Sequence, residues 1–164
     1  MKFKLALPLV LLFFACCLTF CNGSRNVIRY DLTKTIDSLV SSYKSGDSIV
    51  NDHHLCQAFP KDWDSIAILN PYEPFEQLSK FNLTNLEDLD DTLSVRHTDQ
   101  FCLILFIKDR SITGYSKLKR TPLDFSKATP GDSGKFLIKR ADCNAVYLKR
   151  TSVSSATYDV HVRR

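Results

Sequence analysis

The chain has 164 residues, 24% of them charged, with six cysteines and a formal net charge of +4 at pH 7. About 140 residues follow an N-terminal apolar segment, and this length fits one domain with one core. Three cysteines fall in that apolar segment, and the other three are too few for a scaffold built from disulfides. We therefore expect a hydrophobic core, and we find no second apolar run long enough to cross a membrane.

Residues 1–23 have the order of a secretory signal peptide. Two lysines precede an apolar run over residues 5–20, and the small residues Cys21 and Gly23 follow it. This order predicts cleavage after Gly23 and a single exported domain over residues 24–164, either secreted or periplasmic. The alternative is a bacterial lipoprotein, since Phe14-Ala15-Cys16 is an imperfect lipobox and a lipid on Cys16 would anchor the chain to the membrane.

Helical signals dominate the first half of the mature chain. Asp31 can cap a helix whose apolar residues recur at helical spacing up to Tyr43. Residues 49–59 are predicted to be extended, and residues 63–69 form a strand that ends at Asn70-Pro71-Tyr72. Short helical turns are predicted from Pro74 to Phe81 and over the leucine-spaced residues 83–93.

Strand signals dominate the second half. Residues 101–107 are apolar at every position, which predicts a central strand covered on both faces. A hairpin turn at 108–111 leads to a return strand over 112–118, and residues 135–140 and 145–150 are predicted to form the next pair. Alternation over 157–162 indicates a half-buried closing strand. The pattern predicts an α+β fold, with an N-terminal helix and short helices packed on a mainly antiparallel sheet of about five or six strands.

Charge is distributed unequally along the chain. Residues 24–100 contain 7 Lys and Arg against 13 Asp and Glu, whereas residues 101–164 contain 13 against 5. The simpler interpretation is that the two halves lie against each other and partly neutralise. The alternative is a basic face on the C-terminal sheet that binds lipid headgroups, a polysaccharide or an acidic protein. An exported chain without a nucleic-acid-binding motif is not expected to bind nucleic acid.

The run Gly131-Asp132-Ser133-Gly134 matches the surroundings of a serine protease nucleophile. Lys135 stands where that family has a second glycine, no histidine lies in the expected setting, and the chain is too short for two barrels. The spacing to the following Gly-Lys is also wrong for a phosphate-binding loop. We predict an ordinary turn before a strand.

The stretch Asn51 to Cys56, "NDHHLC", brings potential ligands together. If it is extended, Asp52, His54 and Cys56 lie on one face, as a Cys-His catalytic site or a metal site would need. Zinc sites usually take paired ligands from two segments, and the other donors here are scattered singly. His54 and Cys56 are therefore weak metal candidates, and we predict no metal and a buried or disulfide-bonded Cys56. The sequence leaves the pairing among Cys56, Cys102 and Cys143 open.

Residues 55–125 combine a Trp-Asp strand that runs into a Pro-Tyr turn with a later hydrophobic hairpin. The stretches are "FPKDWDSIAILNPYEPFEQL", "FCLILFIKDRSITGYSKLKR" and "LDF". In these features the chain resembles small uncharacterised exported proteins and lipoproteins of bacteria, which implies an α+β extracytoplasmic domain without an assigned activity. Trp63, Asp64 and Tyr72 match the pattern and are weak binding candidates. Their expected roles are structural, with Trp63 in the core, Asp64 bonded to backbone and Pro71 ending the strand.

No catalytic constellation stands out, so the favoured function is a non-enzymatic exported domain that binds a protein or cell-envelope partner. One alternative is a small-ligand or lipid-binding protein, which a large apolar pocket between helices and sheet would favour. Another is an enzyme that uses Asp52, His54 and Cys56. No cofactor is expected, and the oligomeric state is left open.

Overall fold

The computed structural model describes residues 27–43, 49–51, 54–89, 99–125, 128, 137–152 and 157–163. Its strands are β1 (Ile28–Arg29), β2 (Ile49–Asn51), β3 (Ser65–Leu69), β4 (Phe101–Lys108), β5 (Ser111–Lys119), β6 (Leu123–Asp124), β7 (Leu137–Lys139), β8 (Val146–Arg150) and β9 (Tyr158–Val162). Its helices are α2 (Thr33–Ser41) and α3 (His54–Gln57), with 3-10 helices η1 (Phe75–Phe81), η2 (Leu86–Asp88) and η5 (Arg140–Ala145). The α+β class is confirmed. The strands form two sheets, of five and four strands, where the sequence predicted one.

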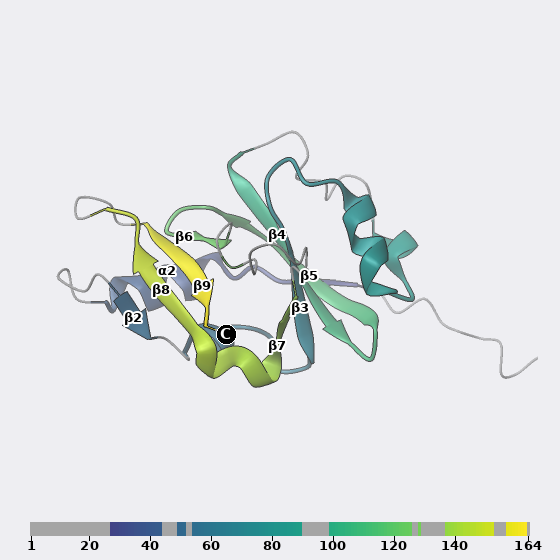
Figure 1. The fold of residues 1–164 in the computed structure, drawn as a ribbon, viewed down its shortest axis with the longest axis horizontal. Helices are drawn as coiled ribbons and strands as arrows, with labels where there is room; N and C mark the ends of the chain where they lie inside the picture. The colour runs from purple at the N-terminus through teal and green to yellow at the C-terminus, as the bar shows by residue number, and fades with distance from the viewer. Residues whose placement is uncertain are drawn as a thin grey trace, which may run out of the picture.

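The five-stranded sheet has the order β1-β5-β4-β3-β7 and lies in the middle of the molecule (Figure 1). Its centre is β4, which pairs antiparallel with both β3 and β5. Every residue from Cys102 to Ile107 is buried, because side chains on both faces of this strand are covered by other elements. The predicted central strand, and the reason given for its continuous apolar sequence, are confirmed.

The four-stranded sheet has the order β2-β8-β9-β6. The predicted pairing of residues 135–140 with 145–150 is wrong, because β7 pairs with β3 in one sheet while β8 pairs with β2 and β9 in the other. The six-residue helix η5 separates β7 from β8, so the chain leaves the first sheet and enters the second.

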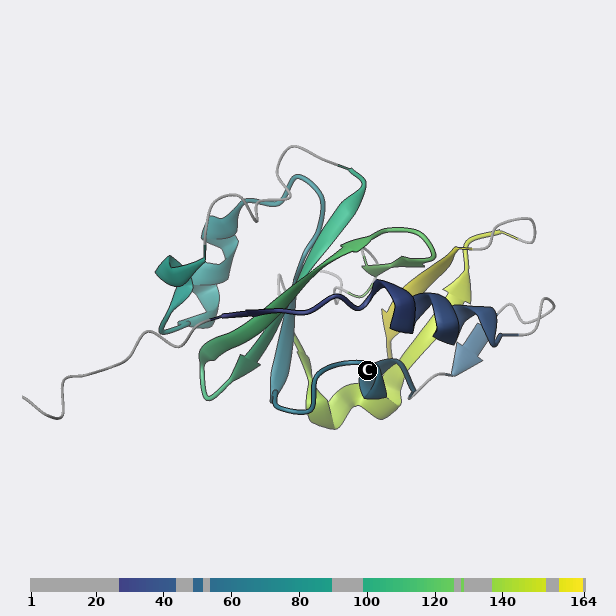
Figure 2. The same cartoon turned by 180° about the vertical axis from the view of Figure 1, so that it is seen from behind.

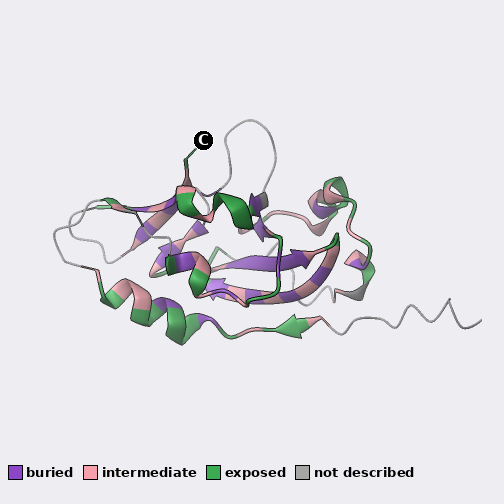
Figure 3. Ribbon diagram, turned by 90° about the horizontal axis from the view of Figure 1, so that it is seen from below, coloured by how far each residue is buried: buried purple, intermediate pink, exposed green. Residues whose placement is uncertain are grey.

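Two apolar clusters cover opposite faces of the five-stranded sheet. The larger one includes Ile66, Ile104 and Phe106 and reaches α2, α3 and the inner face of the four-stranded sheet. The smaller one includes Leu69 and Leu105 and is closed by η1 and η2. Figure 1 shows η1 and the four-stranded sheet on opposite sides of the five-stranded sheet, and Figure 3 shows the buried residues concentrated in the strands.

Helix α2 follows β1 and lies on the same side of the molecule as the four-stranded sheet (Figure 2). The predicted helix is present, and Asp31 Oδ1 accepts a hydrogen bond from the Thr33 backbone N–H at 3.1 Å, although the N-cap residue is Leu32. Ile36 is buried in the larger cluster, and Leu39 packs against the same cluster. The polar side chains of α2 therefore remain on its outer surface.

The turn between β4 and β5 has no glycine. Asp109 and Arg110 have φ of 50° and 63°, in the left-handed region that few side chains favour. The guanidinium of Arg110 donates from Nε and Nη2 to the Asn82 carbonyl oxygen at 3.2 and 3.0 Å, and the Asp109 backbone N–H donates to Asp64 Oδ2 at 3.0 Å. These bonds fix the turn between the end of η1 and the start of β3.

Candidate functional site

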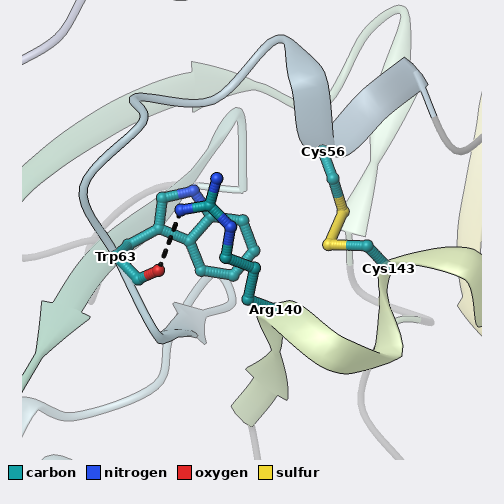
Figure 4. Close-up of a disulfide and its surroundings, with 4 residues drawn as sticks. All are labelled: Cys56, Trp63, Arg140 and Cys143. Carbon is teal, nitrogen blue, oxygen red and sulfur yellow. Dashed lines mark hydrogen bonds between the residues drawn. A yellow bond between two sulfur atoms is a disulfide. The ribbon is translucent and has the colours of Figure 1, made fainter.

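A disulfide joins Cys56 in α3 to Cys143 in η5, and it bridges a sequence separation of 87 residues (Figure 4). Cys102, on β4, is a buried free thiol. Burial, as the main cause, raises the pKa of this thiol to about 12. The pairing that the sequence left open is thus Cys56 with Cys143, and the predicted disulfide-bonded state of Cys56 is confirmed.

The stretch around His54 is helical rather than extended. Among the described residues of this stretch, Ile49–Asn51 form a strand and α3 begins at His54, so the extended conformation predicted over 49–59 is confirmed for 49–51 and wrong from His54 onward. In a helix, residues two positions apart point to different sides, so His54 and Cys56 do not share a face. Because Cys56 is oxidised, it offers no thiolate to a metal or a substrate. Asp52 lies outside the described residues.

His54 is an exposed residue of α3, and its Nδ1 lies 3.1 Å from Gln57 Oε1 in the next turn. Within the described part of the chain, no three His, Cys, Asp or Glu side chains come together to hold a metal ion. The prediction that no metal is bound stays a prediction.

Trp63 lies in the core, with 2% of its surface exposed. Its ring packs edge-on against Phe59, with centroids 6.1 Å apart, and the Arg140 guanidinium lies 5.4 Å from its centroid on the outer side. Arg140 Nη1 also donates to the carbonyl oxygens of Trp63, at 3.3 Å, and of Lys61 (Figure 4). Trp63 is therefore a core anchor sealed by Arg140, and its side chain offers no surface to a partner.

Asp64 and Tyr72 lie at opposite ends of β3. Asp64 bonds to the backbone of the β4–β5 turn, as a structural role predicts. Tyr72 is 62% exposed and has a φ of 67° in the turn that Glu73 stabilises by accepting from the Asn70 backbone N–H at 2.7 Å. A five-residue strand spans roughly 17 Å, so these candidates do not meet in one cleft.

The described elements enclose an open groove of about 530 Å³ between α2 and α3. Its walls are Lys34, Thr35, Ser38 and Leu39 from α2, His54 and Gln57 from α3, and Ala58, which directly follows α3. The volume falls within the range of ligand sites. Five of the seven lining residues are polar, but most of the lining area is apolar. Of the sequence candidates in the described part of the chain, His54 lines this groove.

A second cavity lies between α2 and the β5–β6 connection, lined in part by Ile36, Leu118 and Phe125. Its volume is about 10 Å³, enough for one water molecule and far below the size of an organic ligand. This part of the interface between helix and sheet is closed, so it does not supply the large apolar pocket that a lipid-binding function would need.

The four-stranded sheet carries an aromatic stack that the sequence did not indicate. Tyr147 on β8 and His161 on β9 are directly opposite in the register, and their rings stack at 5.0 Å with an interplanar angle of 14°. The Arg163 guanidinium lies 5.2 Å from the Tyr147 centroid. Alternation within each strand could have placed each ring on the outer face, but the pairing of β8 with β9 was needed to bring them together.

The acidic and basic halves of the chain are interleaved. In the five-stranded sheet, β1 and β3 come from the acidic half and β4, β5 and β7 from the basic half. Lys108 forms an ion pair with Asp62 across the halves, and the hydrogen bond that its Nζ donates to this carboxylate raises the pKa of Lys108. Within the basic half, Asp124 pairs with Arg120 at 2.5 Å and raises the pKa of the guanidinium. The interleaved strands and the Lys108–Asp62 ion pair support the simpler interpretation of the charge asymmetry.

Several sequence predictions lie outside the described residues. They are the signal peptide over residues 1–23 with its alternative lipid site at Cys16, Asp52, and the turn at Gly131–Gly134 with Ser133. None of the helices in the described ranges is long and apolar enough to span a bilayer. Comparison with protein-family models, with curated proteins and with solved structures finds no match to this chain.

Proposed function

We propose that this protein is an exported, disulfide-stabilised domain that binds a protein or cell-envelope partner and does not act as an enzyme. The observation that carries the proposal is the Cys56–Cys143 disulfide. Stable structural disulfides are typical of secreted and periplasmic proteins, and they are rare in the reducing cytosol. The same bond removes the nucleophile on which the enzymatic alternative depended.

The α2–α3 groove is the contact region that we propose for the partner. Its second wall, α3, is a single helical turn, and a helix this short is not stable by itself. The disulfide ties α3 to η5, while buried Leu55 anchors it in the larger cluster. A wall held in this way is preorganised, so a partner would not have to provide the free energy to order it.

Localisation is tested on the protein purified from cells that express the whole chain. We expect a mature N-terminus at Ser24, and a mass two hydrogens below that of the fully reduced chain because of one disulfide. A diacylglycerol-modified Cys16 at the N-terminus would support the lipid-anchored alternative. Recovery of the uncleaved chain with three reduced thiols after Gly23 would contradict export.

Partner binding is tested by site-specific photo-crosslinking. Benzoylphenylalanine replaces Ser38, which lines the groove, and the matched control carries it at exposed Lys139 on β7, which does not. We expect position 38 to give one adduct with the envelope or extracellular fraction of the source cells, abolished by excess unmodified protein. Equal adducts at both positions, or an adduct that excess protein does not reduce, would refute the groove as the binding region.

A further inference from the structure

A cavity of about 380 Å³ lies where β1 runs into α2, and it shares no lining residue with the α2–α3 groove. Arg29, Tyr30, Asp31, Thr33 and Lys117 line it, and we call it the Arg29–Lys117 cavity. Its volume is at the lower end of the range for small-molecule sites. Figure 2 shows the β1–α2 segment that forms one wall.

Strand pairing places two basic residues on the same face of the sheet, where both line this cavity. β1 is parallel to β5, with Arg29 opposite Tyr115. Lys117 follows Tyr115 by two residues, so it projects from the same face of the sheet as Arg29. Lys117 Nζ lies 5.1 Å from the centroid of Phe101 on β4, a cation–π contact that holds the ammonium group over the ring.

The Asp31 carboxylate in this cavity already accepts a hydrogen bond from within the chain. Asp31 accepts a hydrogen bond from the Thr33 backbone N–H at 3.1 Å, and hydrogen bonds from Thr33 are the main cause that lowers the pKa of Asp31. In the described ranges, the ion pairs join Lys108 to Asp62 and Arg120 to Asp124, and neither Arg29 nor Lys117 forms one. The charged groups of the cavity therefore sum to +1, which a monoanion balances.

The β1 backbone beside these charges is held in place by the core. The Tyr30 ring lies on the opposite face of the sheet from Arg29 and Lys117, where it packs edge-on against Phe106 with centroids 5.6 Å apart. The Tyr30 backbone N–H donates to the Tyr115 carbonyl oxygen at 2.8 Å, which continues the β1–β5 ladder up to the helix. A cavity whose wall is fixed by the core can hold a ligand at lower entropic cost than a mobile loop can.

We propose that the Arg29–Lys117 cavity binds a small organic molecule through a carboxylate group. Arg29 offers the planar guanidinium fork that matches a carboxylate, and Lys117 adds a second cation from the neighbouring strand. A monocarboxylate brings the site to neutrality, whereas a phosphate dianion leaves excess negative charge beside Asp31. This function goes beyond partner binding at the α2–α3 groove and uses different residues.

The test is a titration followed by protein NMR, with benzoate as the probe and benzamide as its uncharged analogue of the same shape. We expect benzoate to shift the backbone amides of residues 29–33 and 117 in a saturable way, and benzamide to leave them unchanged. Arg29→Gln and Lys117→Gln should each weaken benzoate binding by at least about tenfold, because each removes a charge-assisted contact.

Lys119→Gln is the matched control, because Lys119 lies on the same strand and is exposed but does not line the cavity. It should bind benzoate like the unchanged protein, and all three variants should keep the unfolding midpoint of the unchanged protein.

Three outcomes would each overturn the proposal. They are equal shifts with benzamide, no saturation with benzoate up to concentrations on the order of 100 mM, and equal weakening of benzoate binding by Lys119→Gln. Tighter binding of inorganic phosphate than of benzoate would overturn the assignment of a carboxylate. None of these readouts depends on the crosslink at Ser38.

Discussion

Asn85 is a buried polar residue that ties the segment between η1 and η2 to β5. Its Oδ1 accepts from the Ile112 backbone N–H at 2.7 Å, and its Nδ2 donates to the Ile112 carbonyl oxygen at 3.0 Å. One side chain thus replaces the strand partner that Ile112 lacks on this side. Together with the Arg110 bonds to Asn82, it holds the η1–η2 segment over the smaller apolar cluster.

Replacing Asn85 with alanine leaves a buried backbone N–H and carbonyl group without partners. We expect Asn85→Ala to lower the free energy of unfolding by about 1–3 kcal/mol, measured by urea denaturation. The control is Asn144→Ala, at an exposed position of η5, which should change it by less than about 0.5 kcal/mol. Equal effects of the two substitutions would contradict the role assigned to Asn85.

Cys102 makes stability depend on pH in the alkaline range. Its thiol has a usual pKa of 9.0 and a pKa of about 12 in the folded protein, so between these values the unfolded chain loses the proton while the folded chain keeps it. The free energy of unfolding should therefore fall as pH rises through this window, by up to about 1.4 kcal/mol per pH unit, with no contribution below it. Denaturation at about pH 8 and about pH 10 should show a smaller loss for Cys102→Ala than for the unchanged protein. An identical loss in both proteins would exclude this contribution.

At the level of elements, the two-residue strand β1 depends on a glycine in its partner. A Cβ on Gly114 would collide with the Tyr30 ring and would lie 2.8 Å from the Ile28 carbonyl oxygen. Because the second contact is with backbone, rotation of Tyr30 does not relieve it. Close approach of β1 to β5 therefore needs glycine at this position.

Gly114→Ala should destabilise the protein by about 1–3 kcal/mol and should increase hydrogen exchange at the Tyr30 amide, which bonds to the Tyr115 carbonyl. Ser116→Ala, two residues along the same strand, is the control. Its hydroxyl is buried without a hydrogen-bond partner in the described residues, so its loss should leave exchange at Tyr30 unchanged. Unchanged exchange in Gly114→Ala would show that β1 does not rely on this contact.

At the level of the whole molecule, the Cys56–Cys143 disulfide connects the two halves of the chain. It fastens α3, which follows β2, to the helix through which the chain passes from the five-stranded to the four-stranded sheet. A cross-link over 87 residues restricts a large loop of the unfolded chain, so it should contribute strongly to stability.

Replacing both Cys56 and Cys143 with serine should lower the free energy of unfolding by about 2–5 kcal/mol. Reducing agent should lower the stability of the unchanged protein by a similar amount and should have no effect on the double variant. Sensitivity of the double variant to reducing agent would show that another disulfide contributes.

Local patterns in the sequence were enough to predict the α+β class, helix α2, the strands β3, β4, β5 and β9, and the core position of Trp63. These features depend on periodicity and turn residues, which act over a few neighbouring positions. Only the tertiary structure decided that the strands divide into two sheets, that Cys56 pairs with Cys143, and that Arg29 and Lys117 meet at one cavity. These arrangements join segments far apart in the chain, and each depends on which long-range pairing buries the most apolar surface and satisfies the most backbone groups. The short apolar strands of this sequence are compatible with several partners, so their local patterns do not encode that choice.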